Sequence, residues 1–346
     1  MFYNCLFKNN MIKNYVFITD IGKECDDTLA LLVLLHHHIL KKINLVAIVV
    51  SGSNLHERVK IVLYWLMKYK IKNIAVIKSR DLYMKNELKC DKHNCDNVSY
   101  TTLEDYNNTI VKKSLYSILT GKKTITIICT SVLTPLADII IYHPYDKYNI
   151  EHIYLQGSAT YSNDVLYPIF NEHNFIIDKK STNIVLKLFR NVIPFTFLGN
   201  DTTSLIHITK NHLHSLDVIG CLNLTPQAED NLINISKDRI LFKKLFEDNF
   251  PKTFDIDDDK FFQKDNKFLK YINKYIDCNG LLLTYIALYP ETCTRAKILK
   301  INDKIIHRIY NRKDETIFKK SIYDIANDLF NIVLTSIHTV RYNISQ

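Results

Sequence analysis

The sequence FITDIGKECDDTLALL (residues 17–32) joins a hydrophobic run to a segment with helical periodicity through a short acidic loop. The loop contains Gly22, one of only seven glycines in the chain, and the carboxylates Asp20, Asp26 and Asp27 flank it. A sharp turn at the glycine would bring these carboxylates together, and their oxygens would suit a hard cation such as calcium. Acids in a first helical turn also stabilise the helix N-terminus, so capping is the alternative role of Asp26 and Asp27.

Short runs rich in Ile and Val alternate with segments of helical periodicity. Strands of this composition, each followed by a helix, predict a parallel sheet that is covered on both faces. We therefore expect an α/β fold with a doubly wound, mostly parallel sheet and helices on both faces. The expected strands are residues 15–19, 44–50, 73–77, 124–129, 152–157 and 193–199.

Residues suited to a ligand site follow the ends of five expected strands. In a doubly wound sheet, the ligand binds beyond the carboxyl ends of the strands, where the loops of one rim meet. We expect a site at this rim, formed by Asp20, Asn54, residues 130–134, Gly157 and Asn200.

Five motifs carry a resemblance to a known family. They are TDIGKECDDTLAL (19–31), AIVVSGSN (47–54), SVLTPLAD (131–138), NEHNFIIDKKSTNIV (171–185) and PFTFLGNDTT (194–203). In this order they resemble motifs of the nucleoside hydrolases, the inosine–uridine-preferring N-ribohydrolases, as a divergent member would. The resemblance implies a nucleoside-hydrolase-like fold.

The resemblance also implies calcium-dependent hydrolysis of the N-glycosidic bond of ribonucleosides, which releases base and ribose. Asp20 and Asp27 match calcium-ligating aspartates, and Thr134 matches a threonine whose backbone carbonyl binds the ion. Asp20 is further expected to be the general base that takes a proton from water. A calcium ion in such a site holds sugar hydroxyls and lowers the pKa of a bound water.

Four further residues match family positions that bind the ribose and orient it for reaction. These are Asp26, Asn54, Glu172 and Asn174. The group that protonates the leaving base has no clear counterpart, and His173 is a candidate only by its position.

The chain departs from the family pattern near its C-terminus. The family's HDPLA helix start supplies another calcium-ligating Asp, and the matching segment NGLLL (279–283) has Gly280 in that place. Because glycine has no side-chain ligand, we expect calcium binding to be weakened or lost, unless Asp277 replaces the missing carboxylate.

Two functions therefore remain open. The first is a working nucleosidase with an altered metal site. The second is a catalytically degenerate family member that acts as a ribosyl-ligand-binding or structural, interacting protein. The six retained polar residues favour the first, and the missing ligand favours the second.

Composition narrows the class of protein. The 346 residues are 47% hydrophobic, enough for a large core, and we expect a single domain over 1–346 with a mainly helical segment at about 221–275. The net charge of +9 comes from lysines spread along the chain, so a nucleic-acid partner is not favoured over a ribonucleoside or related ribosyl ligand.

Cysteine usage and hydropathy predict the compartment. Eight scattered cysteines fit reduced thiols, and the chain has neither a signal-peptide cleavage pattern nor an apolar run long enough to span a membrane. We therefore expect a cytoplasmic protein, and the family adds the expectation of a homo-oligomer. The pair Cys90 and Cys95 flanks His93 but lacks the further ligands of a zinc site, so a loop is expected there.

Overall fold

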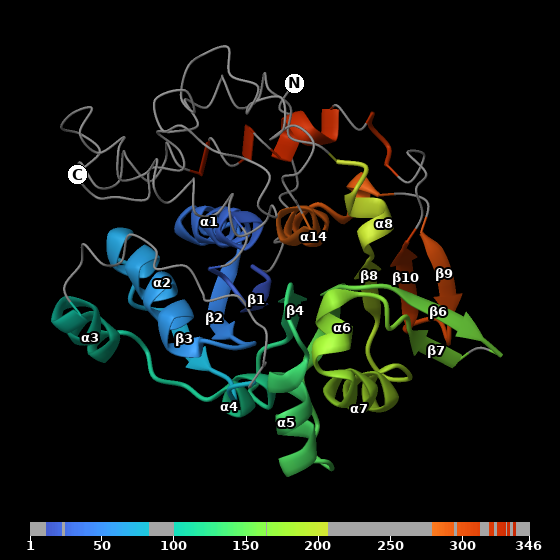
Figure 1. Ribbon diagram of the computed structural model, residues 1–346, viewed down its shortest axis with the longest axis horizontal. Coiled ribbons are helices and arrows are strands. Elements are labelled where there is room, and N and C mark those ends of the chain that lie inside the picture. The colour runs from blue at the N-terminus through green and yellow to red at the C-terminus, as the bar shows by residue number, and fades with distance from the viewer. Residues whose placement is uncertain are drawn as a thin grey trace, which may run out of the picture.

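A central sheet of eight strands forms the middle of the molecule in the computed structural model (Figure 1). The strand order is β3-β2-β1-β4-β5-β8-β10-β9, and every neighbouring pair is parallel except β9 with β10. The structure describes residues 12–22, 25–82, 100–163, 165–206, 279–293, 296–311, 318–321, 324–329, 331–332 and 335–336.

The expected doubly wound α/β fold is confirmed, and all six expected strands are present. They are β1 (Asn14–Thr19), β2 (Asn44–Val50), β3 (Ala75–Lys78), β4 (Ile125–Cys129), β5 (Ile150–Gln156) and β8 (Phe195–Leu198).

Four short strands were not expected from the sequence. β9 (Lys297–Lys300) and β10 (Ile306–Tyr310) extend the sheet beyond β8, while β6 (Ala159–Ser162) and β7 (Val165–Pro168) pair as a separate hairpin. Each has four or five residues, and β9 and β10 carry charged side chains within the run. Such strands lack the continuous apolar run that marks a buried parallel strand.

Helices cover both faces of the sheet (Figure 1). The helices before residue 70 are α1 (Cys25–Ile39) and α2 (Leu55–Lys68). Further helices among the described residues are α3 (Tyr100–Thr109), α4 (Leu115–Leu119), α5 (Thr134–Tyr142), α6 (His173–Ile177), α7 (Lys179–Phe189), α8 (Asn200–Thr203) and α14 (Asn279–Leu288).

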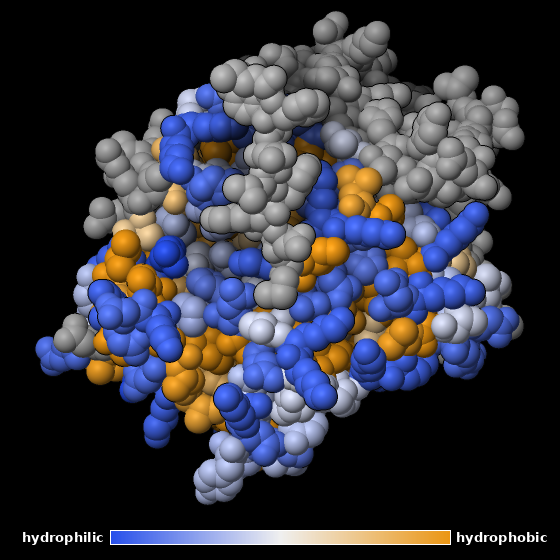
Figure 2. Space-filling model, turned by 180° about the vertical axis from the view of Figure 1, so that it is seen from behind, coloured by the Kyte–Doolittle hydropathy of each residue, from blue (hydrophilic) through white to orange (hydrophobic). Residues whose placement is uncertain are grey.

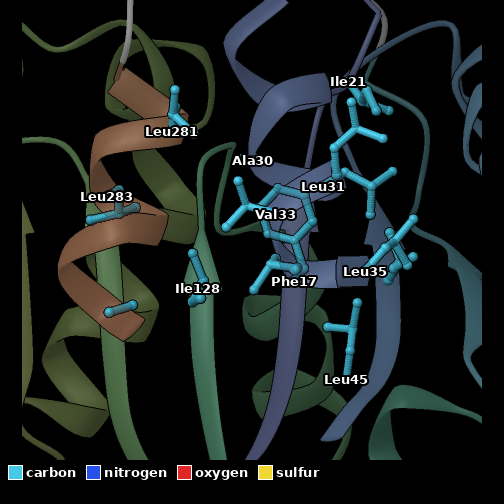
Figure 3. Close-up of a cluster of buried hydrophobic side chains, with 14 of the residues drawn as sticks. Phe17, Ile21, Ala30, Leu31, Val33, Leu35, Leu45, Ile128, Leu281 and Leu283 are labelled. Atoms are coloured by element: carbon cyan, nitrogen blue, oxygen red, sulfur yellow. The ribbon is translucent and has the colours of Figure 1, made fainter. Parts of the chain in front are cut away.

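The alternation of side chains along the strands creates two separate cores. In β1, Tyr15 and Phe17 pack under α1, α2 and α14, whereas Val16 and Ile18 pack against α4, α5 and α7 on the other face. Figure 3 shows the first core, where α14 lies beside α1 and contributes Leu281 and Leu283. This packing matters for function because it fixes the N-terminus of α14 next to that of α1.

The molecular surface seen in Figure 2 has hydrophobic residues in several separate places among hydrophilic ones. Among the described residues, Tyr142 and Tyr145 at the end of α5 and Val192 after α7 are the most exposed large hydrophobic side chains. Scattered groups of this kind are normal at protein surfaces, and the expected homo-oligomer stays a prediction.

Several expectations fall outside the described residues. These are the helical segment at 221–275, the loop from Cys90 to Cys95 and the substitute ligand Asp277. The single-domain organisation and the cytoplasmic location also stay predictions. Within the described part of the chain, no helix is long and apolar enough to span a membrane.

Candidate functional site

The acidic loop leads directly from the sheet into α1. β1 ends at Thr19, Asp20 follows, and Gly22 has a φ of 118°, which favours glycine over residues with a side chain. Asp26 and Asp27 then lie in the first turn of α1, and both are buried. The turn expected at Gly22 is therefore present.

Asp26 and Asp27, the acidic pair, face the N-terminus of α14. The backbone N–H of Gly280 donates a hydrogen bond of 2.7 Å to Oδ2 of Asp26. An ideal Cβ on Gly280 would lie 2.5 Å from Oδ1 of Asp27 and 3.2 Å from Oδ2 of Asp26. Residues some 250 positions apart in the sequence thus meet at one point, and no side chain fits at position 280 unless the Asp27 carboxylate moves.

Asp20 and Asp27 both lie close to the end of β4. Cys129, the last residue of that strand, is fully buried; burial and, to a lesser extent, the negative charges of Asp20 and Asp27 raise its pKa to about 12. An ideal Cβ on Gly52 would lie 3.3 Å from Cβ of Asp20, so the loop after β2 also touches the acidic loop.

Asn174 connects α6 to the same place. It is buried, and its Nδ2 donates a hydrogen bond of 2.9 Å to the carbonyl of Thr130, just beyond β4. Cγ2 of Thr130 lies 3.3 Å from the ideal Cβ position of Gly280. The structure therefore brings Asn174 to the rim that carries Asp26 and Asp27.

Glu172 precedes α6 in the chain, and its side chain lies beside the end of β8. Its Oε1 accepts a 3.3 Å hydrogen bond from the backbone N–H of Asn200, whose Oδ1 in turn accepts one of 3.3 Å from Nδ2 of Asn279. Burial raises the pKa of Glu172, the Asn200 N–H opposes this, and the charge of Asp201 adds to it. A chain of hydrogen bonds thus runs from Glu172 to the start of α14.

Asn54 lies just before α2 and Thr134 at the start of α5, both after strands that end at the rim. Asn54 is exposed, has a φ of 53° and precedes α2. Thr134 is fully buried at the first position of α5, and its hydroxyl donates a 2.6 Å hydrogen bond to Oδ2 of Asp178. Its side chain therefore anchors α5 to α7.

The residues expected to bind calcium fit that ion only in part. Carboxylate and carbonyl oxygens are the right donors. However, Gly280 stands where the further aspartate is expected, a Cβ there would lie 2.5 Å from Oδ1 of Asp27, and the Gly280 N–H already bonds to Asp26. Among the described residues, no group of three or more His, Cys, Asp or Glu side chains is arranged to hold a metal ion. The structure therefore does not fit the full ligand set that the family resemblance implies.

Arg58 is a site residue that sequence reasoning missed. Its side chain is buried, and it donates hydrogen bonds to the carbonyls of Ser53 (2.7 Å) and Ile21 (3.0 Å). These carbonyls belong to the loops that carry Asn54 and Asp20. An arginine within the apolar face of a helix was the available signal, because a buried guanidinium needs several acceptors.

Ser158 was also missed. Its Oγ is buried and, among the described residues, has no hydrogen-bond partner. The ideal Cβ position of Gly199 lies 3.2 Å from this oxygen and 3.1 Å from Oε1 of Glu172, which places both groups beside one backbone position.

Comparison with known proteins agrees with this architecture. A family model described as inosine-uridine preferring nucleoside hydrolase matches residues 16–294. No curated protein gives a significant match to the sequence.

Solved structures show the same fold at low sequence identity. A purine-preferring ribonucleoside hydrolase from Gardnerella vaginalis is 15% identical with a TM-score of 0.58, over 94% of this chain and 99% of that one. An inosine-uridine preferring nucleoside hydrolase from Bacillus anthracis is 13% identical, with a TM-score of 0.54 over 93% and 99%. The type III effector XopQ, complexed with adenosine diphosphate ribose, is 10% identical with a TM-score of 0.60, over 94% of each chain.

Proposed function

Because the chain belongs to the inosine-uridine preferring nucleoside hydrolase family, we propose that its rim site hydrolyses the N-glycosidic bond of ribonucleosides. The family and the fold support ribonucleoside hydrolysis in general. The observation that carries the proposal for this chain is the meeting of α1, α14 and the loop after β4, where Asp26, Gly280 and Asn174 converge.

The reaction needs a water molecule, a base for its proton and groups that hold the sugar. Water attacks the anomeric carbon while the bond to the base breaks, through a transition state of oxocarbenium character. We assign the proton of the water to Asp20, which lies at the end of β1 beside the loop after β2. The carboxylates at the rim also favour the positive charge that develops on the sugar.

Asp26, Asn54, Glu172 and Asn174 are proposed to bind the ribose hydroxyls. Two of them are fixed by hydrogen bonds to the backbone of neighbouring loops: Asn174 to Thr130 and Glu172 to Asn200. Side chains held in this way lose little entropy when the sugar binds and so convert binding energy into orientation. The proton of the leaving base stays unassigned, because the side chain of His173 is exposed on α6.

The proposal includes at most a weak calcium site. Asp20, Asp27 and the carbonyl of Thr134 would supply three ligands, with two negative charges between them. Calcium affinity falls steeply with the number of charged ligands, so such a site would be weak. No step of the proposed reaction is assigned to the ion.

Release of free base and ribose tests the proposal. Purified protein is incubated with inosine and with uridine, and products are separated by liquid chromatography. We expect both products in equal amounts from the wild type, and a rate at least about 100-fold lower for Asp20→Asn, since general-base catalysis contributes on this scale. Equal rates in the two proteins would refute the role of Asp20.

Binding of a ribosyl ligand without turnover is the second candidate. It is favoured by the lack of a side-chain ligand at Gly280, where a Cβ would lie too close to Asp27, and by the ADP-ribose complex of the structurally similar XopQ. Saturable calorimetric binding of ADP-ribose or inosine, with no released base after prolonged incubation, would select this candidate over the hydrolase.

A further inference from the structure

We propose that the N-terminus of α14 has replaced a metal ligand, so that the acidic site is complete without a divalent cation and binds its ligand in the absence of calcium. The part of this inference that concerns the ligand rests on the proposed function. The part that concerns the cation stands on the geometry around Gly280 alone.

The first argument is steric. At position 280 a Cβ would lie 2.5 Å from Oδ1 of Asp27, closer than real Cβ contacts, and 3.2 Å from Oδ2 of Asp26. Moving α14 away would expose its leucines, because Leu281, Leu282 and Leu283 are all buried in the core that α14 shares with α1. Glycine at this position therefore lets the backbone of α14 approach the two carboxylates more closely than a residue with a side chain could.

The second argument concerns charge. The Gly280 N–H bonds directly to Asp26, and it is one of the first N–H groups of a ten-residue helix, whose N-terminus carries partial positive charge. The buried guanidinium of Arg58 bonds to the carbonyl of Ile21, the residue after Asp20. The acidic loop thus contacts two sources of positive potential that belong to the protein itself.

The third argument concerns the ligands that remain. The hydrogen bond to Gly280 occupies one oxygen of Asp26. This carboxylate is therefore held by the protein itself. Gly280 holds Asp26, and Arg58 holds the carbonyl next to Asp20, through hydrogen bonds that involve no cation.

Calcium titration of the wild type is the direct test. Protein freed of metal with EDTA and exchanged into calcium-free buffer is titrated with CaCl₂ in a calorimeter, without any other ligand. We expect no saturable binding below about 1 mM calcium, the weak end of protein sites. Binding in the micromolar range would overturn the proposal.

Two variants at position 280 supply the matched comparison. Gly280→Asp returns a carboxylate to the site, and Gly280→Asn adds a side chain of the same shape without the charge. Either side chain requires the Asp27 carboxylate to move. We expect Gly280→Asp to bind calcium at least tenfold more tightly than the wild type, and Gly280→Asn to bind calcium no more tightly than the wild type. Thermal unfolding with and without calcium gives a second readout: a calcium-dependent rise in Tm is expected for Gly280→Asp alone. A calcium-dependent rise in the Tm of the wild type would contradict the proposal, and this result does not depend on whether the variants fold.

A ligand experiment separates this inference from the proposed function. Inosine binding and base release are measured for the wild type in EDTA and in 1 mM CaCl₂. We expect values within twofold of each other, and loss in EDTA with recovery in calcium would overturn the inference. If the wild type neither binds nor cleaves a nucleoside in either buffer, the proposed function fails, while the calcium titration still decides the role of α14.

Discussion

At the scale of single residues, Arg58 joins the two loops that carry Asp20 and Asn54. Its guanidinium is buried and bonds to the carbonyls of Ile21 and Ser53. Replacement by Met keeps the apolar stem but leaves both carbonyls without this donor. We expect Arg58→Met to lower the free energy of unfolding by about 2–4 kcal/mol, given about 1.5–3 kcal/mol for a hydrogen bond to a charged group.

Urea unfolding followed by circular dichroism measures this loss. Arg58→Lys is the control, because it keeps the charge but offers only one nitrogen, so an intermediate loss is expected. Unchanged stability in Arg58→Met would show that the loops do not depend on the guanidinium. The position illustrates what sequence reasoning lacks, since an arginine inside helix α2 gives no hint that its acceptors lie in two loops.

Gly157, just after β5, provides a second test at this scale. It has a φ of 146°, and a Cβ there would overlap the ring of Phe175, which follows Asn174 in α6. We expect Gly157→Ala to lower the free energy of unfolding by about 3 kcal/mol or more, because both backbone strain and overpacking act against it. Gly121→Ala is the control, since its φ is ordinary and its nearest neighbours are backbone oxygens at 3.1 and 3.3 Å. A smaller loss for Gly157→Ala than for Gly121→Ala, again by urea unfolding, would contradict the prediction.

At the scale of elements, the sequence was most informative where strands were long and apolar. β1, β2 and β4 have buried runs of Ile and Val, and their bounds were predicted to within one residue. β9 and β10 were missed because their short runs include charged residues. In addition, β9 pairs with β10 and β10 pairs with β8, so this part of the sheet depends on distant parts of the chain.

The site was predictable in the same uneven way. The turn at Gly22 and the position of Gly280 beside the acidic pair follow from local spacing and from the family motifs. The direction of the Thr134 hydroxyl does not, because it depends on Asp178 in a different motif. Local sequence gives the order of elements, whereas contacts between their ends come from packing.

Asp178 is the residue that joins two of these elements. As N-cap of α7 it accepts hydrogen bonds from the backbone N–H and the hydroxyl of Ser181, and it also accepts one from Thr134 in α5. Burial alone would raise the pKa of Asp178, but these hydrogen bonds lower it below its ordinary value. We expect Asp178→Ala to lower the free energy of unfolding by about 1–2 kcal/mol at pH 7, in the range of lost caps.

The pH dependence of that loss is a sharper test. Because the folded-state pKa of Asp178 is depressed, its stabilisation is present above the unfolded pKa of about 4 and disappears as the pH falls through the folded value. The difference in stability between wild type and Asp178→Ala should therefore shrink below pH 4. Asp178→Asn keeps the shape without the charge and should show less pH dependence than the wild type. A difference that stays constant down to pH 3 would contradict this account.

At the scale of the whole molecule, buried histidines link stability to pH. Burial lowers the pKa of His36 to about 4 and that of His152 to about 3, and it also lowers the pKa of His307. His307 belongs to β10, and its Nδ1 accepts from the backbone N–H of Phe195 in β8 while its Nε2 donates to the carbonyl of Arg190. The folded protein therefore keeps these rings neutral at pH values where an unfolded chain would protonate them.

The sign of the effect follows from these shifts. Below about pH 6.5 the unfolded state binds protons that the folded state does not, so the free energy of unfolding should fall as the pH falls from 6.5 toward 4. Each such histidine adds a slope of up to about 1.4 kcal/mol per pH unit. Urea unfolding at pH 7.5, 6.5, 5.5 and 4.5 measures the slope. His152→Gln can still bond to the Thr196 hydroxyl, the partner of His152 Nε2, but cannot protonate, so it should show a shallower slope than the wild type. Parallel curves for the two proteins would mean that His152 takes up its proton equally in both states.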